Sequence, residues 1–314
     1  MNENKYCIGL FLDFKKAFDT VPHDILLKKL EKLGITGTAL KWFASYLSNR
    51  TQKVEVNSTL SDSKELNISV FQGTCLGPIL FLCFVNDLPS VTDLLTILFT
   101  DDTTGLYSSS DLPSLITRIQ NELTKLSHWF IANKMFLNVS KTKYIIFHVQ
   151  GKRIERGTTL QIDANLPDTA HNPDLVATVE RIHSKHANYD TQACKLLGIY
   201  LDEHLNLNHN TARLTFNLSR ACFFINRAKN ILSPKALKTL YTSFFHTHLL
   251  YCTNIYACTS EANTTAIFRQ QKKVIRILAK ADCLEHTAPL FESLSILSLE
   301  KIILQARVTF MHSI

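Results

Sequence analysis

Hydrophobic residues in the first third of the chain predict two short strands that each lead directly into acidic residues. Cys7–Leu12 is a continuous apolar run before Asp13, and Leu94–Phe99 is a second, largely apolar run before Asp101 and Asp102. Short apolar runs of this kind are typical of strands that are covered on both faces. Because an unpaired carboxylate at the end of a buried strand is costly, Asp13 in particular indicates a chemical role.

Apolar residues at helical spacing predict helices around these strands. We expect amphipathic helices over residues 26–33, 40–47 and 112–132, and an apolar helix from about Leu76. Gln52–Val56 and Leu66–Val70 alternate polar and apolar residues, which predicts a hairpin or strand pair. With a further strand at Tyr144–Phe147, residues 1–150 are expected to form one α+β domain.

The second half of the chain begins with a polar stretch and continues with helical patterns. Residues 151–193 lack hydrophobic periodicity and contain Pro167 and Pro173, which predicts a loop insertion or linker. A short apolar strand at Leu196–Leu201 follows, and the remaining residues are mainly helical in pattern. Residues 194–314 are therefore expected to form a third region, a strand followed by helices.

Composition and charge narrow the class of protein. The chain has 314 residues, is 46% hydrophobic and carries a formal charge of +7, which predicts one or two globular domains and favours a polyanionic partner. Eight scattered cysteines without a Cys-x-x-Cys pair indicate reduced thiols rather than a zinc site or a disulfide framework. The start lacks the pattern of a secretory signal, and the most apolar segment, Ile79–Val85, is too short to span a membrane. We expect no membrane span and a location inside the cell, nuclear or cytoplasmic.

The strand-end acids are suited to holding divalent cations. Two-metal sites for phosphoryl transfer need bridging carboxylates, and Mg²⁺ prefers oxygen ligands. Asp13 and Asp101 supply such ligands if their strands pair. Neighbouring strand residues face opposite ways, so Asp102 joins them only through a turn. Taken alone, the Asp101–Asp102 pair is more typical of an ordinary turn than of a metal site.

Five segments, in order along the chain, resemble the sequence blocks of reverse transcriptases from non-LTR retrotransposons of the LINE or jockey type. Phe11–Val21 resembles motif A, Phe71–Phe81 motif B, Leu98–Thr103 motif C, Asn138–Thr142 motif D, and Lys195–Asp202 the block of the primer-grip region. Each block alone is weak evidence. Their common order covers nearly the whole chain and makes the resemblance specific.

The resemblance implies a fold and a chemistry. The fold is α+β, a palm with a small antiparallel sheet backed by helices, followed by a mainly helical thumb and connection. The activity is RNA-directed DNA synthesis from deoxynucleoside triphosphates on an RNA template with a DNA primer. The site residues implied are Asp13, Asp101 and Asp102 for two Mg²⁺ ions, with Mn²⁺ as a substitute, Phe14, Phe18, Gln72 and Gly73 for the nucleotide, and Lys141 as the general acid. Phe18 stands where the family has its aromatic gate against ribose. Each residue alone also fits a plainer role: a core aromatic, an ordinary turn or a solvated lysine.

Basic residues in the tail suggest contacts with nucleic acid. Arg213, Arg220, Arg227 and Lys229 alternate with aromatic residues, so the cations are candidates for backbone phosphates. The alternative is an amphipathic helix with its aromatics in the core and its charges in water.

The sequence also departs from the family. Met1 lies a few residues before motif A, so we expect the finger and endonuclease segments to be encoded upstream and this chain to have weak or no activity alone. Phe71 replaces the usual Pro of motif B, Thr74 and Cys75 replace Ser-Val, and Thr100 replaces a small Ala. Two further hypotheses remain open: a non-catalytic nucleic-acid-binding remnant, and a different metal-dependent enzyme such as a nuclease.

Overall fold

The chain folds into two units, Met1–His183 and Ser184–Ile314, in the computed structural model. The structure describes residues 5–152, 154, 159–163, 176–183 and 192–313. No helix within these ranges is both long enough and apolar enough to cross a membrane.

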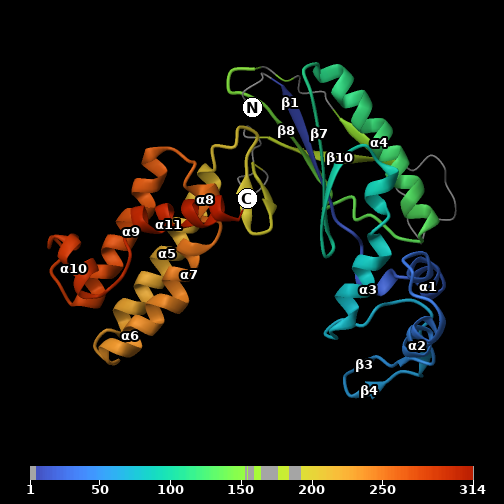
Figure 1. Cartoon of the computed structure of the whole chain (residues 1–314), viewed down its shortest axis with the longest axis horizontal. Coiled ribbons are helices and arrows are strands. Elements are labelled where there is room, and N and C mark those ends of the chain that lie inside the picture. Colours follow the sequence, from blue (N-terminus) through green and yellow to red (C-terminus); the bar gives the residue numbers. More distant parts are fainter. Residues whose placement is uncertain (1–4, 153, 155–158, 164–175, 184–191, 314) are drawn as a thin grey trace. The chain divides into compact units, whose positions relative to one another are not determined.

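The first unit is built on a six-stranded sheet with the order β6-β7-β1-β8-β10-β9 (Figure 1). Its strands are β1 (Tyr6–Leu12), β6 (Leu95–Phe99), β7 (Asp102–Ser109), β8 (Lys143–Phe147), β9 (Leu160–Asp163) and β10 (Val176–Ile182). Neighbouring strands are antiparallel except for β8 and β10, which are parallel. The predicted α+β fold with a mainly antiparallel sheet is confirmed.

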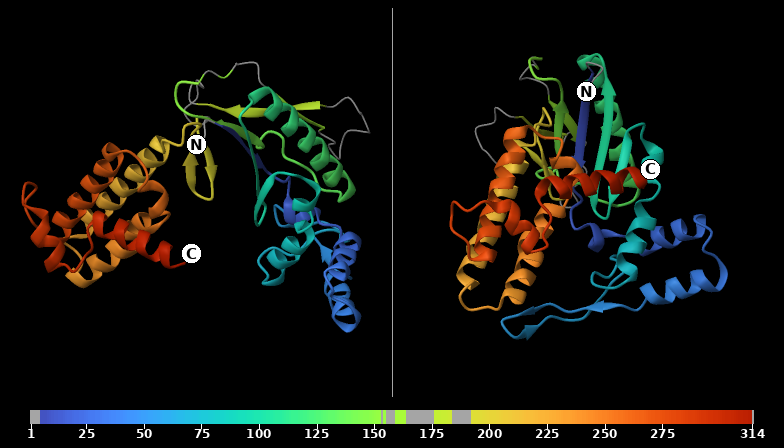
Figure 2. Two further views of the ribbon diagram at one scale, coloured as in Figure 1. Left: turned by 45° about the horizontal axis from the view of Figure 1, so that its top comes forward. Right: turned by 60° about the vertical axis from the view of Figure 1, so that its left-hand side comes forward.

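Helix α4 lies against one face of this sheet, where it contacts β1, β7 and β9 (Figure 2). The helical segments are η1 (Ala17–Thr20), α1 (His23–Lys32), α2 (Gly37–Leu47), α3 (Leu76–Val85), η2 (Leu88–Val91) and α4 (Leu112–Ala132). The alternation of β1 turns Ile8 and Leu10 into a fully buried core that also contains Ile119 and Leu123 of α4. Each such side chain contributes roughly 1.5–3 kcal/mol through burial. The core therefore fixes β1, the strand that precedes Asp13.

A two-stranded ribbon lies between α2 and α3. Its pairs are β2 (Thr51–Gln52) with β5 (Lys64–Glu65) and β3 (Glu55–Val56) with β4 (Thr59–Leu60). Asn57 and Ser58 have φ angles of 49° and 63° and form the turn of the ribbon. The predicted pairing of residues 52–56 with residues 66–70 is wrong, because this tight turn sends the chain back earlier.

The strand at residues 95–99 is not buried on both faces, contrary to the prediction. β6 is an edge strand of the sheet, and Leu95, Ile97 and Phe99 are 67%, 47% and 58% exposed. The sequence pattern of an apolar strand is the same at the edge and in the centre. Only the strand order decides which faces are covered.

Residues 151–193 are not all loop or linker, also contrary to the prediction. β9 and β10 lie within this stretch and extend the sheet beyond β8. The buried residues of β9 are Leu160 and Ile162, which stand at alternate positions. Those of β10 are Val179 and Ile182. These apolar patterns are short and flanked by polar segments, so the strands were not predicted from the sequence. Pro167 and Pro173 lie outside the described residues.

The second unit is a short hairpin followed by helices, as predicted. Its elements are β11 (Cys194–Leu196), β12 (Ile199–Leu201), α5 (Asn208–Ala228), α6 (Pro234–Leu240), the π-helical η4 (Tyr241–His246), α7 (Thr247–Leu250), α8 (Thr253–Tyr256), α9 (Glu261–Ala279), α10 (Thr287–Ser293) and α11 (Leu299–His312). Leu218 and Cys222 of α5 are buried in one cluster with Val274 and Ile275 of α9. This packing leaves Phe216, Phe223 and Phe224 of α5 exposed to solvent.

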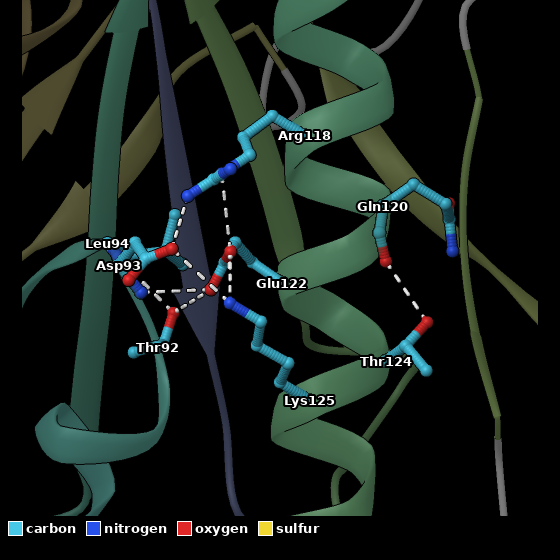
Figure 3. A network of polar contacts seen from close by, with 8 residues as sticks. All are labelled: Thr92, Asp93, Leu94, Arg118, Gln120, Glu122, Thr124 and Lys125. Carbon is cyan, nitrogen blue, oxygen red and sulfur yellow. Dashed lines mark hydrogen bonds and ion pairs between the residues drawn. The ribbon is translucent and has the colours of Figure 1, made fainter.

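A buried carboxylate on α4 fixes the segment that leads into β6 (Figure 3). The fully buried Glu122 accepts hydrogen bonds from the Thr92 hydroxyl at 2.8 Å and from the Asp93 backbone N–H at 2.9 Å. The Lys125 ammonium lies 2.8 Å from Glu122 and 3.3 Å from Asp93, and Arg118 pairs with both acids. The start of β6 is thereby attached to the core helix.

Loss of the Glu122 carboxylate is expected to destabilise the first unit in a pH-dependent way. Burial alone would raise the pKa of Glu122, but the hydrogen bonds from Lys125, Asp93 and Thr92 outweigh it, and the pKa lies below its ordinary value. A depressed pKa contributes stability that is present above the unfolded-state pKa, about 4.3, and is lost as pH falls through the folded-state pKa. We expect Glu122→Ala to lower the free energy of unfolding by about 2–3 kcal/mol at pH 7, because Thr92 and Asp93 lose their acceptor.

The measurement is urea unfolding followed by tryptophan fluorescence, since both tryptophans, Trp42 and Trp129, lie in the first unit. The difference between wild type and Glu122→Ala should be constant above about pH 5 and shrink below pH 4. Glu122→Gln, which keeps one acceptor oxygen, should lose less at pH 7. An equal loss in both variants at every pH would contradict the role of the charge.

Candidate active site

The three strand-end acids come together at one end of the sheet. β1 and β7 are antiparallel with Leu12 opposite Thr103, so the register, continued by one residue, sets Asp13 opposite Asp102. Asp101 lies in the two-residue turn that joins β6 to β7, in which Thr100 has a φ of 56°. The strand pairing on which the predicted metal site depends is therefore present.

Asp13 and Asp102 lie on the same face of the sheet, because directly opposite residues on neighbouring strands share a face. Asp101 and Asp102 are exposed, and the side chain of Asp13 is 36% exposed. Carboxylates that share a small region repel one another, and a divalent cation with oxygen ligands relieves that repulsion. The donor set thus fits Mg²⁺ or Mn²⁺.

The loop of Asn138–Thr142 is bonded directly to the end of β1. Asn138 N–H donates to the Asp13 carbonyl at 2.7 Å, and Asp13 N–H donates to the Thr142 hydroxyl at 3.3 Å. These bonds bring the Lys141 ammonium within 3.9 Å of the Asp13 carboxylate, with the lysine side chain 69% exposed. The structure therefore brings Lys141 to Asp13, while the buried Thr142 anchors the loop. The sequence analysis missed the anchoring role of Thr142, although its place after Lys141 in the motif was visible.

The segment that carries Gln72 lies beside η1. Val70 N–H donates to the Phe18 carbonyl at 2.8 Å, and the Gln72 amide donates to the Asp19 carboxylate at 3.5 Å. Gln72 and Gly73 are both exposed in the turn before α3. The segment just before motif B is thus bonded to motif A through its backbone, and Gln72 contacts motif A through its side chain.

The two phenylalanines of motif A have different environments. Phe18 is half-buried, and its ring stacks on Phe81 of α3 with 4.9 Å between centroids and 27° between planes. Phe14 is buried and makes edge contacts with Phe81 and Phe130 at 6.4 and 5.7 Å. The Phe14 ring therefore lies in the core among aromatic side chains, and the nucleotide contact expected of this residue stays a prediction. Phe81, which orients both rings, was missed because it reads as one residue of an apolar helix.

The cationic residues of the second unit lie on one side of α5, next to exposed aromatic rings. The guanidinium groups of Arg213 and Arg220 lie 5.8 and 5.9 Å from the Phe216 ring, and that of Arg227 lies 5.3 Å from Phe223. Phe216, Phe223 and Phe224 are exposed, so the alternative in which these aromatics face the core is wrong. Lys229 follows directly after α5 and is half-buried.

This region of the sequence contains basic residues but no acidic ones. Residues 204–260 contain no aspartate or glutamate, while six lysines and arginines lie among them: Arg213, Arg220, Arg227, Lys229, Lys235 and Lys238. Such a segment favours a polyanion over an acidic or neutral partner.

Sequence comparisons give the family. Residues 1–201 match the family model described as reverse transcriptase (RNA-dependent DNA polymerase). The chain is 26% identical over 293 residues to the RNA-directed DNA polymerase from mobile element jockey of Drosophila melanogaster, which covers 90% of this chain and 29% of that protein. It is 26% identical over 294 residues to the probable RNA-directed DNA polymerase from transposon BS of the same fly, with 90% and 30% covered.

The similar solved structures share less sequence identity with the chain than these relatives do. Telomerase from Candida tropicalis has a TM-score of 0.41 and 12% identity over 93% of this chain and 43% of that one, and telomerase from Candida albicans has a TM-score of 0.38 and 14% identity over 93% and 51%. Likeness at this level is too loose to define the fold. The chain spans about 30% of the length of the curated relatives that it matches. Residues 1–201, which the family model matches, contain the segments that resemble motifs A to D. The chain therefore belongs to the reverse transcriptase family, in the branch of the non-LTR retrotransposons.

Proposed function

We propose that this chain performs template-directed DNA synthesis, joining deoxynucleoside triphosphates to a DNA primer on an RNA template. The observation that carries the proposal is the meeting of Asp13, Asp101 and Asp102 at one end of the sheet, with the Gln72 turn bonded to the segment that follows Asp13. Nucleotidyl transfer needs divalent ions near the attacking hydroxyl and the triphosphate. Three carboxylates from two adjacent strands and a turn supply oxygen ligands for them.

The metal ligands in this proposal are Asp13 and Asp101, with Asp102 assisting, and the ions are two Mg²⁺, which Mn²⁺ can replace. Bound there, the ions supply Lewis-acid stabilisation of the phosphate charge and lower the pKa of a coordinated hydroxyl. The polypeptide contributes the fixed separation of the ligands, because β1 is held by the core and the turn is held by the pairing of β6 with β7.

The remaining site residues select the nucleotide and assist its leaving group. The Phe18 ring, backed by Phe81, would exclude a ribose 2′-hydroxyl, and Gln72 and Gly73 would line the pocket. Lys141, held beside Asp13 by the loop hydrogen bonds, would donate a proton to the departing pyrophosphate.

The second unit would bind the backbone of the primer and template. Arg213, Arg220 and Arg227 present planar guanidinium groups beside exposed rings, and Lys229 adds a further charge. Arginines contact phosphates, and aromatic rings accept bases or sugars. A nuclear or cytoplasmic location follows from this proposal, because an RNA template and deoxynucleoside triphosphates are found there.

Primer extension on an RNA template, with Mg²⁺ or Mn²⁺ and with or without chelator, tests the proposal. The wild-type chain, whose activity alone is expected to be weak, should extend the primer only with the divalent ion, and Asp101→Asn should lower extension to the level with chelator. Equal extension by both proteins would remove the proposal. If neither extends, but both bind RNA with the same salt dependence, the chain is a nucleic-acid-binding remnant, a role that the acid-free segment 204–260 favours independently.

A further inference from the structure

A column of planar side chains begins on α2 and reaches the motif B turn. It consists of Trp42 and Tyr46 of α2, Arg50 just after that helix, and Phe71 before Gln72, and we call it the α2 column. The Trp42 and Tyr46 rings are stacked with 5.6 Å between centroids and 11° between planes, and Phe71 meets Tyr46 edge-on at 5.5 Å. The Arg50 guanidinium lies 5.4 Å from the Tyr46 ring and 5.2 Å from the Phe71 ring. Four planar groups thus follow one another in contact.

The column is open to solvent at the end that Trp42 occupies. Trp42 is 54% exposed, although an indole ring is among the most costly surfaces to leave in water. Its contacts with Tyr46 and Phe43 leave the rest of the ring uncovered. The second tryptophan, Trp129, is 6% exposed in the core. A partner that covers Trp42 would therefore gain burial and stacking together.

The charge of the sequence that carries the column favours an anionic partner. Between Glu31 and Glu55 the sequence contains no acidic residue, while it contains four basic ones: Lys32, Lys41, Arg50 and Lys53. An apolar protein surface would not need these cations. A flexible anion with planar groups, which is what a single strand of nucleic acid offers, satisfies both the rings and the charges.

Hydrogen bonds join the column to the proposed nucleotide pocket. The Tyr46 hydroxyl donates to the Thr74 hydroxyl at 3.5 Å, and the Thr74 hydroxyl donates to the Phe71 carbonyl at 2.9 Å. Phe71 directly precedes Gln72. The residue that replaces the proline of motif B is therefore the one that connects this pocket to the column.

We propose that the α2 column is a stacking platform for the single-stranded RNA template next to the nucleotide pocket. This inference rests on the proposed polymerase function, since the reaction uses an RNA template. An unpaired base stacks on the exposed part of Trp42, and Arg50 and its neighbouring lysines contact the phosphates. Stacking makes the platform tolerant of sequence, as a template path must be.

Tryptophan fluorescence reports occupancy of the platform directly. The probe is an RNA–DNA hybrid with a 5′ single-stranded RNA overhang, compared with the same hybrid made blunt. The overhang should quench Trp42 emission, while the emission of buried Trp129 stays constant. Trp42→Phe should retain binding within about threefold but lose the quenching, because a phenyl ring still stacks. Trp42→Ala should weaken the overhang-dependent binding by roughly 5- to 150-fold, the range for loss of one stacked base.

Matched variants separate stacking from charge. Arg50→Lys keeps the cation but removes the planar group, and it should weaken overhang binding less than Trp42→Ala. Leu33→Ala, which removes a comparably exposed apolar side chain on the neighbouring segment, should leave binding unchanged.

Three results would overturn the proposal: equal quenching by blunt and overhanging hybrids, unchanged affinity of Trp42→Ala for the overhang, or tighter binding of a DNA overhang of the same sequence. Each of them leaves the polymerase proposal intact if extension still depends on Asp101. Loss of that dependence with normal quenching would instead remove the polymerase function and leave the RNA-binding surface.

Discussion

Asp13→Asn is expected to reduce primer extension by at least about 10²- to 10³-fold, the loss typical when one preorganised electrostatic group of an active site is removed. The substitution removes a full negative charge between β1 and the Asp101 turn, while asparagine has almost the same shape. The loop around Lys141 should keep its place, because its hydrogen bonds to residue 13 use the backbone N–H and C=O. Only the exposed ion pair between Lys141 and the Asp13 carboxylate is lost. Asp13→Asn should therefore lower the rate of primer extension without unfolding the protein.

The measurement is the extension rate over a range of Mn²⁺ concentrations, together with urea unfolding and RNA binding. Asp13→Asn should need more Mn²⁺ and stay slow at saturation, with unfolding within about 0.5 kcal/mol of wild type, as for most surface substitutions. Asp24→Asn is the matched control, because Asp24 is exposed in the first turn of α1 and is not one of the strand-end acids. If Asp24→Asn loses as much extension as Asp13→Asn, Asp13 has no special place in the site.

The strand pairing at the site and the limits of the sheet were not equally visible in the sequence. An apolar run that ends in an acid is a local pattern, whereas the meeting of Asp13 with the Asp101 turn was conditional on the pairing of their strands, which the resemblance implied and the register of β1 and β7 supplies. Which strand lies at the edge depends on residues far away in the sequence. The exposure of Phe99 on β6 and the addition of β10 beside β8 are such non-local outcomes.

The supporting residues of the site were hidden for a related reason. Glu122 lies among the apolar positions Ile119, Leu123 and Leu126 of one predicted helix, and a lone acid on an apolar face is the signal that was overlooked. Its partners Thr92 and Asp93 lie in a loop before β6 and cannot be inferred from helical periodicity. Phe14 shows the converse, since a motif position predicted to contact the nucleotide has its side chain in the core.

Gly77→Ala is expected to destabilise the first unit by about 3 kcal/mol, at the upper end of the cost of overpacking. A Cβ at residue 77 would lie 2.2 Å from the Phe71 carbonyl oxygen and 3.3 Å from the Thr74 hydroxyl. The nearer atom belongs to the backbone, so α3 and the motif B turn would have to move apart. Because the turn carries Gln72 and bonds to Phe18, the shift should also disturb the nucleotide pocket.

Gly73→Ala in the same turn distinguishes packing from backbone strain. No atom lies within 4 Å of a Cβ at residue 73, but its φ of 79° is unfavourable for alanine and should cost roughly 1–2 kcal/mol. Urea unfolding followed by tryptophan fluorescence should rank Gly77→Ala below Gly73→Ala in stability. Only Gly77→Ala should also lower quenching of Trp42 by the RNA overhang, because Phe71 moves with its carbonyl. Equal stabilities would mean that the approach of Phe71 to α3 is not what the glycine at residue 77 permits. The motif B turn would then be positioned by the hydrogen bonds of the preceding Ser69 and Val70 to Val21 and Phe18 and by its own side-chain bonds.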